Sequence, residues 1–309
     1  MQSIGASGIL GIALETVSGT YLAPVKYVPF NSESLKYNPN MQERVPIRNT
    51  PGLVGLVPGN GSVEGDIEFD VSADILVHFM YASRCTVVKT GTAPSLIYTC
   101  TPSPAAIPAK TLSISIKRGN EVFGYTGCVV SSLKLAIGDN GILVCTVSII
   151  GNNETTQTAL TATWPTTPVI SAGMYKLEIP TATQIYDTDT FEFSTEDNAK
   201  ANGRIKNTPG SQFVNFGESR ASISVERDFE TRAQYDLFKA GTAQSVHLVA
   251  TQSVSNIVDI TMPVAIMDSY EVNIGGQGDL LRASVSFQGV VDGTGKHYQI
   301  VVTTNEVLS

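Results

Sequence analysis

The residue types that most often carry chemistry are few and scattered in this sequence. His78, His247 and His297 lie far apart, and each is expected to be an ordinary surface histidine. The spacing of the cysteines contains no Cys-x-x-Cys pair of the kind that binds zinc. A Gly-x-Ser-x-Gly elbow and a Gly-Lys-Ser/Thr phosphate loop are also absent. We therefore predict no catalytic residue, no metal site and no cofactor, and a protein that is not an enzyme.

One short segment resembles a catalytic motif. Residues 187–190 read Asp-Thr-Asp-Thr, which is similar to the Asp-x-Asp-x-Thr motif of phosphotransferases that use an aspartyl nucleophile. Such a site needs a parallel sheet with crossover helices, and the sequence indicates neither. We expect these residues to lie at the entrance of a β-strand instead.

A row of carboxylates suggests calcium binding at first sight. Glu64, Asp66, Glu68 and Asp70 alternate with Val63, Gly65, Ile67 and Phe69. Alternation places the four acids along one face of a strand, whereas calcium needs its ligands folded around the ion. A solvated acidic face is therefore the expected outcome.

The elements around these residues are mainly strands. The alternating segment is one strand, and a short helix follows it, with Ser72 as its N-cap and apolar residues at helical spacing. A hairpin is predicted from Ser132 to Ile150 around the turn at 138–141, and a second from Ser269 to Gly289 around 275–278. The segment from Cys85 to Lys110, rich in Pro and Thr, is interpreted as an insertion.

The chain contains an internal repeat. The hexapeptide that starts at Ile47 (Ile-Arg-Asn-Thr-Pro-Gly) recurs from Ile205 with Lys in place of Arg. Asn207 follows Asn49 by 158 residues (207 minus 49), and this offset also aligns identical residues outside the hexapeptide. The further identities are Asn40 with Asn198, Gly59 with Gly217, Glu68 with Glu226, Asp70 with Asp228, and Ala82 with Ala240. A period of half the chain predicts one ancestral domain, duplicated and fused.

The repeat suggests boundaries for two domains. We predict a first β domain at 1–153, a linker rich in Thr and Pro at 154–174, a second β domain at 175–295, and a C-terminal extension at 296–309. The fold class is mainly β, with two tandem related antiparallel sandwich or barrel domains. Each domain carries a short flanking α-helix and one long loop. The loops span 38–61 and 196–218, and we expect them to be functional.

Composition narrows the class of function. The formal charge of −8 argues against a protein that wraps nucleic acid through phosphate contacts, although nucleic acid could still slide past such a surface. The apolar patch at 9–14 lacks the pattern of a signal peptide, and no apolar run approaches the length needed to span a bilayer. In a reducing cytoplasm the four cysteines, all in the first half, are expected to be free thiols.

The order of these segments resembles a known family. The run Ala-Leu-Glu-Thr-Val-Ser-Gly-Thr at 13–20 leads to Val-Pro-Phe-Asn-Ser-Glu-Ser-Leu at 28–35. An Arg-containing loop, a Gly-rich strand entrance and a short helix ending at Ala82 follow. This order, given twice, is similar to that of the tail tube (major tail) proteins of long-tailed bacteriophages, in the class with a duplicated tube domain.

The resemblance implies a structural virion protein. Three chains would form a homotrimeric, pseudo-hexameric ring, and stacked rings would form the tube through which DNA is ejected. The long loops would reach the neighbouring ring, and the resemblance places in them Arg44, Arg48, Asn49, Pro51, Arg204, Lys206, Asn207 and Pro209. Because acids and hydroxyls do not hold phosphates, we expect these residues to face the lumen: Glu64, Asp66, Glu68, Asp70, Ser224, Glu226 and Asp228. Arg282 lies among the outward positions and fits this scheme poorly.

The implied partners follow from that role. They are other copies of the chain, the tape-measure protein and double-stranded DNA inside the bore without specific binding, and other tail proteins at the tube ends. Assembly would take place in the bacterial host cytoplasm, with no membrane involved, and the tail could be contractile or non-contractile. The alternative is a two-domain β-sandwich adhesin or carbohydrate-binding module. Such binders usually expose aromatic clusters, and this chain has a single tryptophan, Trp164, in the linker.

Overall fold

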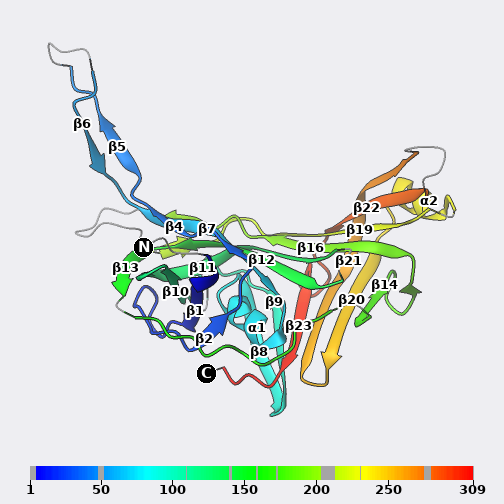
Figure 1. Cartoon of the computed structure of the whole chain (residues 1–309). Coiled ribbons are helices and arrows are strands. Elements are labelled where there is room, and N and C mark those ends of the chain that lie inside the picture. The colour runs from blue at the N-terminus through cyan, green and yellow to red at the C-terminus, as the bar shows by residue number, and fades with distance from the viewer. Residues whose placement is uncertain are drawn as a thin grey trace.

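Antiparallel strands dominate the protein (Figure 1). The computed structural model describes residues 5–47, 52–108, 110–138, 141–157, 159–171, 173–202, 213–229, 231–274 and 280–308. The elements of the first half are η1 (Gly5–Ser7), β1 (Ile9–Leu14), β2 (Lys26–Val28), β3 (Ser32–Glu33), β4 (Lys36–Asn38), β5 (Met41–Arg44), β6 (Gly55–Pro58), β7 (Ser62–Asp70), α1 (Ala73–Tyr81), β8 (Cys85–Thr92), β9 (Ser95–Pro102), β10 (Leu112–Arg118), β11 (Glu121–Ile137), β12 (Leu143–Gly151) and β13 (Asn153–Gln157). Those of the second half are β14 (Tyr175–Glu178), β15 (Gln184–Ile185), β16 (Thr188–Glu196), β17 (Lys200–Asn202), β18 (Phe213–Asn215), β19 (Arg220–Asp228), α2 (Ala233–Lys239), β20 (Gln244–Ser253), β21 (Asn256–Asn273), β22 (Arg282–Gly289) and β23 (Gln299–Thr304).

One long sheet runs through both halves of the chain. Its strands lie side by side in the order β4, β7, β12, β11, β16, β19, β22 and β21, and each neighbouring pair is antiparallel. The first four strands belong to the first half and the last four to the second. Strands β7 and β19, each the second strand of its half, are 158 residues apart. They start at residues 62 and 220 and end at residues 70 and 228. The order of pairing within the first four strands is thus the order within the last four.

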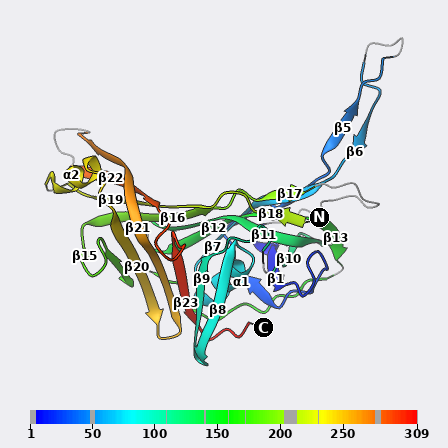
Figure 2. The ribbon, with the colours of Figure 1, turned by 180° about the vertical axis from the view of Figure 1, so that it is seen from behind.

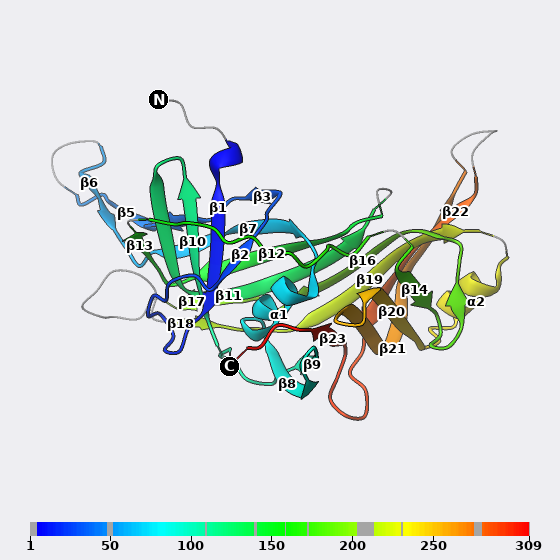
Figure 3. The ribbon, with the colours of Figure 1, turned by 60° about the horizontal axis from the view of Figure 1, so that its bottom comes forward.

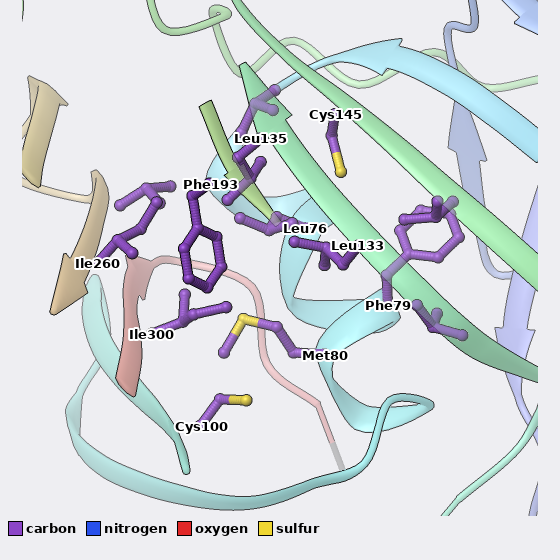
Figure 4. Packing of buried hydrophobic residues seen from close by; sticks show 14 of the residues in the cluster. Leu76, Phe79, Met80, Cys100, Leu133, Leu135, Cys145, Phe193, Ile260 and Ile300 are labelled. Atoms are coloured by element: carbon purple, nitrogen blue, oxygen red, sulfur yellow. The ribbon is translucent and has the colours of Figure 1, made fainter. Parts of the chain in front are cut away.

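A second layer covers one face of the long sheet. Helix α1 and strands β1 and β23 cross this face (Figure 3). The hairpin β8–β9 joins the layer because β9 pairs with β23, which also pairs with β21. Between the layers, Leu133, Leu135 and Phe193 of the long sheet meet Met80 of α1 and Ile300 of β23 (Figure 4). One buried cluster therefore includes residues from both halves.

The two helices differ in burial. Every residue of α1 from Ala73 to Met80 is buried, because apolar side chains cover nearly its whole circumference. Helix α2 has no buried residue and lies at the far end of the molecule against β21 (Figure 1). Ser72 occupies the N-cap position of α1 as predicted, although its side chain makes no capping hydrogen bond.

The expectation that all four cysteines are free thiols was wrong. Cys85 and Cys100 form a disulfide between the paired strands β8 and β9, and only Cys128 and Cys145 are free, both of them buried. The free-thiol prediction failed because strand pairing, which places two cysteines side by side, is not visible in their spacing. The segment from Cys85 to Lys110, interpreted as an insertion, contains this hairpin, and the second half has no strands between α2 and β20 that would correspond to it within the described residues.

The division into two domains stays a prediction. Strand β16 of the second half pairs with β11 of the first, and β23, from the predicted C-terminal extension, pairs with β9. The predicted linker is held along the first half, since the Ile170 N–H donates to the Val71 carbonyl at 2.9 Å. Asn256 also donates from its side chain to the Pro168 carbonyl at 2.7 Å.

Candidate assembly surfaces

The acids singled out in the sequence lie on the uncovered face of the long sheet. In β7, Val63, Ile67 and Phe69 are buried, while Glu64 and Asp66 between them are exposed. Glu68 and Asp70 are partly exposed on the same side of the strand. In β19 the same alternation buries three residues and leaves uncovered Ser224, Glu226 and Asp228. We call this side of the sheet, with the seven predicted residues, the polar face.

The neighbouring strands continue the polar face with hydroxyl groups. Glu68 lies opposite Thr146 of β12, and Glu226 lies opposite Thr190 of β16 and Ser284 of β22. A face dominated by acids and hydroxyls offers phosphate groups few attractive partners.

Two cations on the polar face are held in ion pairs, while Lys36 of β4, opposite Glu64, is exposed. Lys134 Nζ lies 2.7 Å from a Glu192 carboxylate oxygen. Arg282, which the sequence could not place, lies opposite Asp228 in the ladder, with its guanidinium 2.5 Å from Asp189. Both pairs reduce the positive charge that the face presents to solvent.

Each half sends out a two-stranded arm. Arm 1 is the segment from Asn40 to Gly59 with β5 and β6, and arm 2 is the segment from Asn198 to Gly217 with β17 and β18. Both roots are built alike. Asn40 and Asn198 adopt φ of 45° and 44°, in the left-handed region that Asn tolerates. The Gly59 N–H donates to the Pro39 carbonyl, as the Gly217 N–H does to that of Asp197.

The arms differ in what surrounds them. Arm 1 projects away from the body (Figure 1), with Arg44 of β5 exposed. Arm 2 leaves the long sheet beside β11 and β12 and lies along them (Figure 2). The other predicted loop residues, Arg48, Asn49, Pro51, Arg204, Lys206, Asn207 and Pro209, lie outside the described residues.

The long sheet has an unpaired edge at each end. Strand β4 pairs with β7 alone within the described residues. At the other end, β21 pairs with β20 only as far as Ala265, so beyond that residue one side of β21 has no partner strand among the described residues while the other pairs with β22. The unpaired backbone groups of an open edge can pair with a strand of another chain. Sequence reasoning missed these edges, because a strand does not reveal its partners.

The residues considered for chemistry have structural partners instead. Asp187 accepts hydrogen bonds from Arg227 at the entrance of β16, as the sequence predicts. His78 and His297 are buried, contrary to expectation: His78 lies on the buried helix α1, and His297 lies in the segment just before β23. His247 lies between Glu178 and Asp259, at 3.1 Å from a carboxylate oxygen of each. Burial lowers the pKa of His247, but these two hydrogen bonds outweigh it and raise the pKa above the usual value.

Across the described ranges, His, Cys, Asp and Glu form no group of three or more that could hold a metal ion. No helix in those ranges is long and apolar enough to cross a membrane.

A mainly β protein with one projecting arm, two open sheet edges and an uncovered polar face has the features of structural proteins that join their own copies. The chain is a member of the phage tail tube protein family, whose family model matches residues 5–289. It is therefore a structural component of a bacteriophage virion tail, a role that entails self-assembly and contact with other tail components. No curated protein was found to match the sequence.

Proposed function

We propose that three copies of this chain close into a ring, and that stacked rings form the tube through which the phage genome is ejected. One observation carries this proposal. The two strands at the open edges of the long sheet correspond, by their place in each half, to the two strands that pair at its middle. Inside the chain, β11 pairs with β16, the first strand of the second half. The strands at the open edges are β21 and β4. Strand β21 holds the place in the second half that β11 holds in the first, and β4 holds the place in the first half that β16 holds in the second.

The junction between protomers would therefore repeat the junction within one. Pairing of β21 with β4 of the next copy continues the sheet, satisfies backbone groups on both edges and leaves no edge free once the ring closes. Two related halves per chain and three chains make a pseudo-hexameric ring. The 158-residue offset between β7 and β19 supports a duplicated unit as the origin of both halves.

We assign the polar face to the lumen. Its acids and hydroxyls would let DNA and the tape-measure protein pass without holding them, because counterion release from phosphate needs cations. The opposite face of the sheet is covered by α1, β1 and β23 and is closed to a passing polymer (Figure 3). Arm 1 projects from the body (Figure 1), and we assign to it the contact with a neighbouring ring. Ring assembly would take place in the host cytoplasm.

The test is the assembly state of the purified full-length protein. Native mass spectrometry should detect a trimer, and electron microscopy at high concentration should show rings or stacked tubes. A monomer at every concentration would contradict the proposal and favour a binding module. Density for the lumen should place Glu64 and Glu226 on the inner wall, and a wall formed by the α1 side would contradict the lumen assignment.

A further inference from the structure

Arm 2 is packed against the body of its own chain. Ala199, Val214 and Phe216 at its base are 8%, 3% and 6% exposed. They form a separate buried cluster with Val129 of β11, against which Ile150 of β12 also packs. The apolar base of this arm thus covers part of the first half on the polar-face side of the sheet, where Ile150 lies opposite Glu64.

In arm 1 the side chains at the equivalent positions are exposed. Subtracting 158 from Ala199, Val214 and Phe216 gives positions 41, 56 and 58. These are Met41, Leu56 and Pro58, and all three are exposed, Met41 to 48% and Leu56 to 51%. Since the arm roots have the same conformation, the difference arises from the missing surface rather than from the arm.

The second half holds the corresponding surface. In the first half Val129 lies opposite Ile150, with a bulge following in β11 after Val130. In the second half Ile266 lies opposite Gln288, with a bulge following in β21 after Met267. Ile266 is partly exposed, whereas Val129 is 1% exposed under arm 2. Beside Gln288 is an open groove of ≈ 610 Å³, whose lining includes Glu196, Glu218, Ser222, Asp268 and Gly289.

We propose that the base of arm 1 packs onto Ile266 and this groove of the next copy in the same ring, as arm 2 packs onto Val129 within the chain. The inference rests on the ring described under Proposed function and names the contact that locks neighbouring protomers. Met41 and Leu56 supply the apolar contact.

The charges and register at the adjoining edge fit this arrangement. Within the chain Leu133 lies opposite Thr195, and Lys134 lies opposite Ser194. The equivalent positions across two copies are Tyr270 opposite Tyr37, and Glu271 opposite Lys36. Lys36 and Glu271 are both exposed, and directly opposite residues of unlike charge stabilise an antiparallel pair. An aromatic pair beside them adds to the contact.

The experiment uses paired cysteines in the full chain. Leu56→Cys combined with Ile266→Cys should form disulfides between copies under mild oxidation, because only cysteines with nearby Cα atoms can be joined. Most of the protein should then migrate as covalent dimers and trimers on a non-reducing gel. The matched control combines Leu56→Cys with Val254→Cys, an exposed residue outside the groove, and should stay monomeric on the gel. The native Cys128 and Cys145 are buried and should contribute no background.

Native mass spectrometry of the same samples separates the two ways of failing. Trimers whose Leu56→Cys/Ile266→Cys crosslinking does not exceed the control would overturn the docking of arm 1 and leave the ring intact. A chain that forms no ring in any sample would overturn both. Crosslinked trimers at the concentration where the wild-type protein forms rings would support the proposal.

Discussion

At the scale of single residues, one buried carboxylate ties together distant parts of the first half. Glu15, which follows β1, is 3% exposed. Its carboxylate accepts from the Gly19 N–H at 2.7 Å, the Gly127 N–H at 2.9 Å, the Thr111 hydroxyl at 2.5 Å and the Ser113 hydroxyl at 2.8 Å. All four donors would lose their partner together if the carboxylate were removed.

Glu15→Ala should therefore lower the free energy of unfolding by about 3 kcal/mol or more, since each buried unsatisfied donor costs about 1–3 kcal/mol. Chemical denaturation followed by fluorescence measures this loss. Glu121→Ala, at an exposed position, serves as the control and should change the free energy by less than about 0.5 kcal/mol. Equal effects of the two substitutions would show that the network around Glu15 does not contribute to stability.

A second carboxylate, that of Glu306, makes the stability of the fold depend on pH. The side chain of Glu306 lies 3.4 Å from His78 Nε2 and 2.8 Å from Lys26 Nζ, and Lys26 also pairs with Asp74. Hydrogen bonds from His78 and Lys26 lower the pKa of Glu306 to about 2, although burial opposes them. A lowered folded-state pKa stabilises the protein above the unfolded-state value of 4.5, and this contribution is lost as pH falls toward 2.

Glu306→Gln should remove about 2 kcal/mol of stability at neutral pH and flatten the decline of Tm between about pH 5 and pH 2. Thermal denaturation across this range tests the expectation, with Glu43→Gln as an exposed control that keeps the wild-type profile. A variant whose Tm falls with acid as steeply as that of the wild type would contradict the role of Glu306.

At the scale of elements, the two arms have the same root and different surroundings. Val214 of arm 2 is buried against its own chain, while the equivalent Leu56 of arm 1 is exposed. The same substitution should therefore act on folding in one arm and on assembly in the other.

Val214→Asp should lower the free energy of unfolding by about 3 kcal/mol, because it buries an unpaired charge. Leu56→Asp should leave the unfolding of the isolated chain within about 0.5 kcal/mol of wild type and abolish ring formation. Calorimetry of the dilute protein measures the first effect, and light scattering at high concentration measures the second. Normal ring formation by Leu56→Asp would exclude arm 1 from the interface.

At the scale of the whole molecule, the polar face determines how the tube treats DNA. Glu64→Lys with Asp66→Lys would give that face four more units of positive charge per protomer. Assembled tubes should then retain double-stranded DNA, with a salt-dependent affinity whose logarithmic slope grows by about 0.9 for each phosphate contacted.

The measurement is co-sedimentation of DNA with tubes at increasing salt. The control carries the same charge change at Glu121 and Asp236, which lie outside the polar face. DNA retention no greater for the variant than for the control would show that the polar face does not control contact with DNA.

Several features of the fold and the candidate site could be predicted from the sequence. The strand at 62–70, its twin 158 residues later and the hairpin around 138–141 follow from local alternation and turn residues. The same alternation placed Glu64 and Asp66 on an exposed face. Such patterns are readable because the period of a strand and the residues of a tight turn are properties of neighbouring residues.

The tertiary structure alone decided which strands meet. The pairing of β9 with β23, the disulfide between Cys85 and Cys100, and the burial of α1 but not of α2 all depend on elements far apart in the chain. The contrast between the arms has the same origin, because equivalent positions are buried or exposed according to the surface that happens to lie beside them. Local sequence determines the shape of each element, and long-range packing determines its neighbours.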